Sequence, residues 1–232
     1  MIDGELYIAR LSAWALGIEG DDEWKEWARG GREMRSGPEA PEIAFTDSMF
    51  RRRLSQISRM TIQVVHDLQP QGEDTKMIFL SFRGELSRQF RINKMQIEDR
   101  ALMPAAFSLS VFNAPPALAS IALGLKGGYT ALYPGGDSFG SGLDAAGAAL
   151  LAGKAEELIF VYADEELLPE YAGLLPESPP PLAFGLLLSK KAGPGNAPLL
   201  PGVIHSYRDT EKDSPAEFLR SLLLCRGIHV SP

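Results

Sequence analysis

The residues best placed to do chemistry lie in a glycine-rich turn that follows a short strand-like segment. They are Gly135, Gly136, Asp137 and Ser138. β-favouring residues over 129–133 precede the turn and an apolar, alanine-rich run over 138–153 follows it, which predicts a strand, a turn and a helix. Many α/β enzymes place a nucleophile at such a turn, because a helix N-terminus stabilises a developing anion. The turn has no cysteine, so we interpret it as a nucleophile site that lacks the nucleophilic sulfur.

Asp137 and Ser138 have a structural and a functional interpretation. Either side chain can cap the helix, because its oxygen accepts hydrogen bonds from N–H groups of the first turn. Catalysis by Ser138 would need an activating base, and no histidine lies near it in sequence, so capping is the favoured interpretation. A binding role stays open, since the free N–H groups of the turn can hold an acyl carbonyl or a phosphate-like group. A nucleotide phosphate loop is excluded, because the segment lacks the required lysine.

The remaining reactive side chains do not form a recognisable site. His66, His205 and His229 are far apart and lack metal-ligand spacing, so we expect no metal site. Cys225 lies in a leucine-rich run, which favours a small buried apolar residue over a reactive thiol. We expect no cofactor.

The composition is that of an acidic globular protein. The chain has 232 residues and a formal net charge of -7, and this acidic balance disfavours a nucleic-acid partner. Its length suits one large domain or two small ones. A single cysteine excludes an internal disulfide and fits a reducing compartment. The first residues do not form a signal peptide, and no apolar run is long enough to cross a membrane, so we expect a cytoplasmic protein.

Hydrophobic periodicity and turn residues predict alternating strands and helices. Strands are expected over 6–16, 76–82, 129–133, 157–163 and 182–189. Helices are expected over 21–30, 47–68, 85–99, 114–125, 138–153 and 214–226. Loops are expected over 31–45, 104–110 and 169–181, with a linker over 193–202. This order predicts an α/β fold with a mixed sheet of about five strands and helices on both faces.

The ordered set of segments resembles the N-terminal half of β-ketoacyl synthases, which have a thiolase-like fold. It is most similar to the short ketosynthase-like proteins, often labelled chain-length-factor-like, of bacterial fatty-acid or aryl-polyene type polyketide clusters. The segments that carry the resemblance are LYIARLSAWALGIEGDDEWKEW, FRRRLSQISRM, AFSLSVFNAPPALASIALGLKGGYTAL, GGDSFGSGLDAAGAALLAGKAEELIFVYADE and PLAFGLLLSKKAG. The resemblance implies a half-fold over 1–190, followed over 191–232 by a linker and an amphipathic helix that packs on this domain or on a partner.

The resemblance also implies that the condensing chemistry is missing. The family's nucleophilic cysteine aligns with Gly135, or with Gly136 if the alignment shifts by one residue, and glycine cannot form a thioester. Chain-length factors also lack this cysteine, commonly with glutamine in its place. The family's catalytic histidines belong to its C-terminal half, and the tail histidines do not match their motifs. Asn113 lies in the segment that leads to the turn, and we include it among the candidate binding residues.

Two surfaces are expected to meet partners. By resemblance, the strand formed by Tyr129, Thr130, Ala131, Leu132 and Tyr133 lies at the sheet edge and pairs across a two-fold axis, either with itself or with a full-length ketosynthase. Four cations cluster on the helix expected over 47–68, at Arg51, Arg52, Arg53 and Arg59. They can steer an acidic acyl carrier protein, although a solvated face, or salt bridges to Asp47 and the acids of 19–26, is the favoured interpretation.

Three functions follow from these observations. The first is a non-catalytic, chain-length-factor-like subunit that partners a condensing enzyme. The second is an acyl-carrier-linked acyl transferase or condensing enzyme with altered chemistry at Asp137 and Ser138. The third is a module that binds an acyl or phosphopantetheine group at the glycine turn without turnover.

Overall fold

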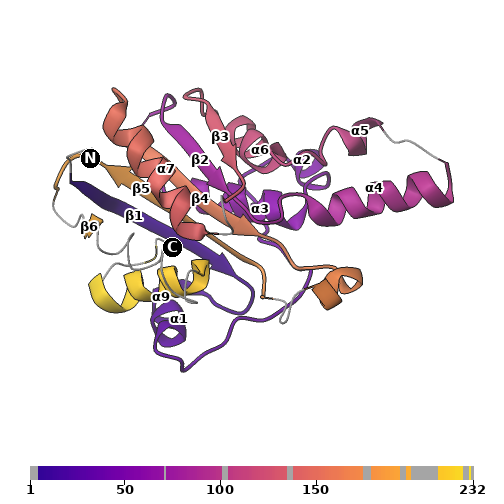
Figure 1. Ribbon diagram of the computed structural model, residues 1–232, viewed down its shortest axis with the longest axis horizontal. Coiled ribbons are helices and arrows are strands. Elements are labelled where there is room, and N and C mark those ends of the chain that lie inside the picture. The colour runs from indigo at the N-terminus through magenta and orange to yellow at the C-terminus, as the bar shows by residue number, and fades with distance from the viewer. Residues whose placement is uncertain are drawn as a thin grey trace.

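A mixed six-stranded sheet forms the centre of the molecule (Figure 1). The computed structural model describes residues 5–70, 72–100, 104–134, 138–174, 179–193, 197–199, 214–226 and 230. The strands are β1 (Leu6–Ala15), β2 (Lys76–Leu80), β3 (Tyr129–Leu132), β4 (Glu157–Asp164), β5 (Leu182–Ser189) and β6 (Ala197–Leu199). Their order across the sheet is β3-β2-β4-β5-β1-β6. β2 is parallel to β3 and β4, and the other neighbours are antiparallel, which confirms the predicted fold class.

Alternate strand residues enter two apolar clusters on opposite faces of the sheet. On β4, Ile159 and Val161 join one cluster and Phe160 joins the other. The first face is covered by α3 (Gln56–Asp67) and α6 (Ala114–Leu123). The second face is covered by α1 (Gly20–Ala28), α7 (Phe139–Ala152) and α9 (Pro215–Arg226), and Figure 1 shows α7 lying across the strands. Because both faces are covered, β4 is a nearly continuous apolar run.

A helical extension projects beyond the sheet (Figure 1). It consists of α4 (Leu86–Glu98) and α5 (Pro104–Phe107), and most α4 side chains are at least partly exposed. A 3₁₀ helix, Pro169–Leu174, follows β4. The sequence predicted loops over 104–110 and 169–181, and these two short helices occupy part of each.

The predicted long helix over 47–68 is wrong, because two caps divide it. Asp47 Oδ1 accepts hydrogen bonds from the N–H groups of Met49 (2.9 Å) and Phe50 (3.1 Å) and starts the short helix α2 (Ser48–Arg51). Ser55 Oγ then accepts from the Ser58 N–H (3.2 Å) and starts α3. Each capping oxygen favours an extended residue at its own position, which interrupts the helical run.

The C-terminal tail contributes to both the sheet and the core. Residues 197–199, within the predicted linker, form β6 and pair with the start of β1. α9 buries Phe218 and Leu219 in the same cluster as Phe139 of α7 and Phe184 of β5. The domain boundary at residue 190 stays a prediction, but these contacts connect residues on both sides of it.

We expect Gly127→Ala to destabilise the entry to β3. A Cβ at Gly127 would overlap the Asp74 carbonyl and lie 2.6 Å from the Thr75 carbonyl carbon, and both are backbone groups that cannot rotate away. The free energy of unfolding in urea should fall by about 2 kcal/mol. Gly72→Ala is the matched control, since nothing lies within 4 Å of its Cβ position, and it should change stability by less than about 1 kcal/mol. Equal effects of the two substitutions would contradict this close approach.

Candidate functional site

In the sequence, the glycine turn falls between the end of β3 and the start of α7. Gly135, Gly136 and Asp137 lie outside the described residues. Ser138 occupies the N-cap position of α7 with an extended backbone, but its side chain makes no capping hydrogen bond. Its carbonyl instead accepts from Ser141 Oγ (2.7 Å). Ser138 therefore has the predicted position without the predicted side-chain contact.

A buried carboxylate joins the ends of the parallel strands β2 and β4. Asp164, the last residue of β4, accepts four hydrogen bonds in the described structure. Oδ1 accepts from Ser81 Oγ (2.6 Å) and the Arg83 N–H (3.0 Å), and Oδ2 accepts from the Tyr162 hydroxyl (2.8 Å) and the Phe82 N–H (3.3 Å). Burial raises the pKa of Asp164, while the Ser81 hydrogen bond and the Arg83 charge oppose that rise. This network holds the end of β2 against the end of β4.

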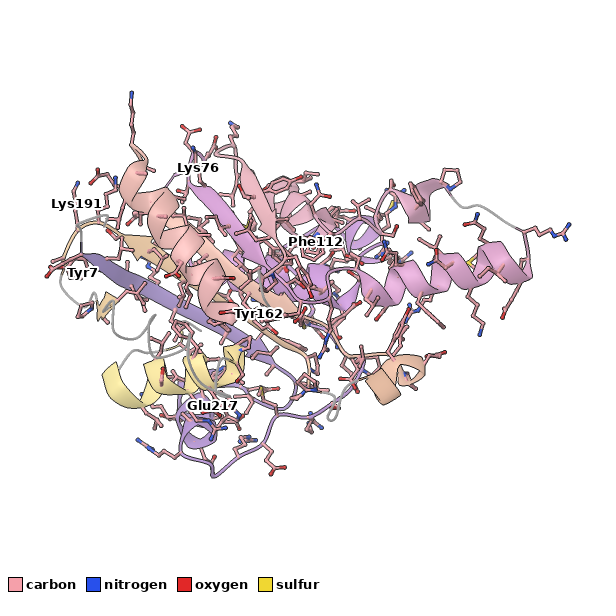
Figure 2. The ribbon with its side chains drawn as sticks, viewed as in Figure 1. Tyr7, Lys76, Phe112, Tyr162, Lys191 and Glu217 are labelled. Carbon is pink, nitrogen blue, oxygen red and sulfur yellow. The ribbon has the colours of Figure 1, made fainter. Side chains whose placement is uncertain are left out.

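The strand ends open on a cavity of about 560 Å³. Its wall includes Phe82, Arg83, Tyr133, Tyr162, Asp164 and Leu182. The Tyr162 ring lies 5.8 Å from Phe139 at the start of α7, and Figure 2 shows Tyr162 beside this end of the helix. Because Tyr162 lines the cavity, the cavity lies close to the start of α7. This site was not predicted from the sequence. Polar residues at the ends of two apolar strands, Ser81 and Arg83 after β2 and Asp164 and Glu165 at the end of β4, are the signal that could have indicated it, because the ends of neighbouring parallel strands meet at one edge.

A second carboxylate cluster lies on the other side of these strand ends. Glu85 accepts from Ser55 Oγ (2.6 Å), Ser58 Oγ (2.7 Å) and Arg88 Nε (3.1 Å). Glu165 accepts from the Ser87 N–H (3.0 Å) in the first turn of α4. Burial and the nearby Glu85 carboxylate raise the pKa of Glu165 to about 7. The two buried acids connect β4 with the starts of α3 and α4.

The four arginines of the expected carrier surface divide into two pairs. Arg51 donates to the carbonyls of Thr46 (2.6 Å) and Ala44 (3.1 Å), and Arg59 donates to the carbonyl of Glu42 (3.2 Å). Burial, followed by the nearby Arg51 charge, lowers the pKa of Arg59.

Arg52 and Arg53 are exposed. In the described part of the chain, none of the four arginines forms an ion pair with Asp47 or with the acids of 19–26. The Asp47 carboxylate caps α2 instead, and three of the other acids pair with Lys25 or Arg32. A carrier-docking role for these arginines stays a prediction.

The predicted pairing strand forms the open edge of the described sheet. β3 bonds to β2 on one side only, and Tyr129 and Tyr133 are exposed. Asn113, the N-cap residue of α6, donates from Nδ2 to the Tyr129 hydroxyl (3.3 Å). The structure therefore brings Asn113 to this edge, while its predicted role in binding stays untested.

The structure describes only some of the histidine and cysteine residues that were predicted not to form a site. His66 Nδ1 lies 2.9 Å from Asp67 Oδ1, and its ring stacks on Phe45. Within the described ranges there is no cluster of three or more His, Cys, Asp or Glu side chains suited to a metal ion. Cys225 lies in the last turn of α9. The tail histidines, His205 and His229, fall outside the described residues. None of the described helices is both long and apolar enough to cross a membrane.

Comparison with known proteins identifies the family. Residues 24–223 match the family model of the β-ketoacyl synthase N-terminal domain, so the chain belongs to that family. No curated protein matches the sequence significantly. Among solved structures, a chain of the complex described as ketosynthase (ApeO) with its chain length factor (ApeC), from Xenorhabdus doucetiae, is 26% identical, with a TM-score of 0.71. The match covers 82% of this chain and 81% of that chain.

More distant structures share the fold. A chain of the ishigamide ketosynthase/chain length factor is 16% identical with a TM-score of 0.64, and the match covers 82% of this chain and 63% of that one. Ketosynthase twelve of the bacillaene polyketide synthase, from Bacillus amyloliquefaciens, is 16% identical with a TM-score of 0.54, with 82% and 42% covered. The protein therefore has the thiolase-like fold implied by its sequence.

Proposed function

We propose that this chain is a non-catalytic, chain-length-factor-like subunit that pairs with a ketosynthase through β3. The observation that carries the proposal is the open β3 edge, where Tyr129 is 37% exposed and Tyr133 is 60% exposed. An unpaired edge strand with apolar side chains is a strong reason to associate. The similarity to a chain of a ketosynthase and chain length factor complex supports a ketosynthase as the partner.

The backbone of β3 is oriented for this pairing. The carbonyls of Gly128 and Leu132 accept from the N–H groups of Met77 (3.1 Å) and Ser81 (3.3 Å). In a parallel ladder, the N–H and C=O of one residue point to the same neighbour. The backbone N–H and C=O groups of Thr130 and Leu132 therefore point to β2, and those of Tyr129 and Ala131 point to the open edge. These N–H and C=O groups form no ladder hydrogen bond within the described sheet, so a partner strand can bond to them.

The sequence supports assembly over catalysis. Gly135 or Gly136 takes the position where the resemblance places a nucleophilic cysteine, and the one cysteine of the chain is Cys225. We propose a cytoplasmic role in fatty-acid or aryl-polyene type polyketide biosynthesis, in which the exposed Arg52 and Arg53 steer an acidic acyl carrier protein. Long-range steering of this kind weakens as salt rises.

The isolated chain should neither condense nor transfer acyl groups. Incubation with acyl-carrier thioesters, followed by intact-mass spectrometry, should show no acyl adduct and no product. Turnover that disappears in Ser138→Ala or Asp137→Ala would instead establish an enzyme with altered chemistry at the turn.

A pull-down against the products of neighbouring genes should recover a ketosynthase, and recovery of the chain alone would contradict the pairing.

A further inference from the structure

The helix α4 is held to the rest of the molecule mainly at its N-terminal end. Ile92 is the one buried residue of α4, and Figure 1 shows the helix projecting beyond the sheet. Its first turn is fixed by hydrogen bonds: the Ser87 N–H donates to Glu165 Oε1 (3.0 Å), and the Gln89 N–H donates to the Glu85 carbonyl (2.9 Å). An element with so few buried side chains opens at a low free energy, so these bonds decide whether α4 stays in place.

Two buried carboxyl groups lie at this end of α4. Glu85 is 2% exposed and Glu165 is 3% exposed. Glu85, the N-cap residue of α4, also accepts from two serine hydroxyls at the start of α3. Glu165, at the end of β4, accepts from the N–H groups of Ser87 in α4 and Ile57 in α3. The pair therefore joins the first turns of both helices to the end of β4.

One guanidinium serves both acids. Arg88 Nε donates to Glu85 Oε2 (3.1 Å), and the two form an ion pair. Arg83 approaches Glu165 from the end of β2, but its Nη1 donates to the backbone carbonyl of Glu165 (2.7 Å) and not to the carboxylate.

The other groups around the pair add no compensating positive charge. α3 contributes only neutral donors, namely two serine hydroxyls and the Ile57 N–H. The acids on either side of Glu165 bond elsewhere: Asp164 accepts from Ser81 Oγ (2.6 Å), and Glu166 Oε2 accepts from the Gly37 N–H (3.2 Å). Two ionised carboxylates at this position would leave a net negative charge out of water, so the pair favours keeping one proton.

We propose that Glu85 and Glu165 form a proton-controlled latch that holds the first turn of α4 against α3 and the end of β4. While the pair keeps one proton, the hydrogen bonds of both carboxyl groups hold the turn closed. When that proton leaves to water, opening of the turn relieves the repulsion by exposing Glu165 to solvent. The latch goes beyond the proposed function, because it needs no partner subunit and uses no residue of β3.

The direction of the pH dependence follows from the two states of the turn. Burial and the Glu85 charge raise the pKa of Glu165 to about 7 in the closed turn, and exposure to water returns it toward its ordinary value of 4.5. Between these values the open turn binds fewer protons than the closed turn, so opening becomes more favourable as pH rises. The opening constant should rise about 20-fold between pH 5.5 and pH 7.5 and level off above that range.

Amide hydrogen exchange on the full chain, followed residue by residue by NMR and corrected for the intrinsic pH dependence of exchange, measures this opening. The Ser87 amide reports the latch, and the Val161 amide, in the centre of β4, reports unfolding of the whole sheet. The Ser87 amide should open at least about 100-fold more often than the Val161 amide, with the stated rise in pH. Equal opening of the two amides would mean that α4 leaves only when the sheet unfolds, which overturns the latch and leaves the proposed pairing standing.

Variants assign the pH dependence to the pair. Glu165→Gln cannot ionise and still accepts from the Ser87 N–H, so it should abolish the rise in opening. Glu85→Gln removes the neighbouring charge and should make the rise smaller than about 20-fold. Glu98→Gln, on an exposed position of α4, is the matched control and should keep the full rise. Circular dichroism checks that each variant is folded. A full rise in folded Glu165→Gln or Glu85→Gln, or no rise in the parent protein, would overturn the proposal.

Discussion

Ala131→Pro should separate the chain from its ketosynthase. Ala131 presents its N–H to the open edge of β3, so proline removes a donor that a partner strand would use and leaves the bonds to β2 in place. The partner's unpaired acceptor and the displaced strand should raise Kd about 100-fold, the equivalent of about 3 kcal/mol. Light scattering on a size-exclusion column and calorimetry with the ketosynthase of the same gene neighbourhood measure the change.

The conservative change at the same position provides the control. Ala131→Ser keeps the N–H and nearly the same volume, so the complex should survive it. A second variant, Tyr129→Lys, places a charge on the edge and should also disrupt pairing, because edge lysines oppose strand addition. A complex that persists in folded Ala131→Pro would show that the partner binds elsewhere on the molecule.

Glu165→Gln should stabilise the protein at alkaline pH. The pKa of Glu165 is raised from an ordinary value of 4.5 to about 7 by burial and by Glu85. The unfolded chain therefore loses this proton at lower pH than the folded chain does, and folding stability falls as pH rises between about 4.5 and 7. Glutamine cannot ionise and can still accept from the Ser87 N–H. The variant should be about 2 to 3 kcal/mol more stable than the parent protein at pH 8.

The pH dependence distinguishes this effect from ordinary repacking. Urea unfolding of both proteins should give nearly equal stability at pH 4.5 and diverge toward pH 8. Glu98→Gln, on an exposed position of α4, is the control and should show no such divergence. A stability difference of the same size at both pH values would mean that the substitution acts through packing and not through the proton.

The elements that are predicted well from sequence are those whose hydrophobic pattern shows directly which of their faces are buried. β4 is recognisable because Ile159 and Phe160 are buried on opposite faces, which gives a continuous apolar run. The turn between β3 and α7 is recognisable from its glycines. The split between α2 and α3 was missed, because the apolar stripe of a single long helix hides the caps at Asp47 and Ser55. β6 was missed because its partner, β1, lies at the opposite end of the chain.

The candidate site was less predictable than the fold, because it is assembled from distant segments. Asp164 contacts Ser81, and Glu85 contacts Ser55 and Ser58, through hydrogen bonds that no local pattern encodes. The cavity wall joins Met34, Leu182 and Pro215, which are separated by most of the chain. The resemblance to ketosynthases indicated where the turn would lie. It did not indicate the ionisable groups that surround the strand ends.

The two edge strands of the sheet, β3 and β6, differ in a way that limits the addition of further strands. At the margin opposite β3, β6 is three residues long and contains the exposed Pro198, which cannot donate a backbone hydrogen bond. Short margins interrupted by proline resist the addition of further strands. β6 pairs with β1 over Leu6–Ile8, and Val230 bridges Leu11, so the C-terminal tail blocks strand addition along the first half of β1. Association through β3 should therefore close at two subunits and not extend into filaments.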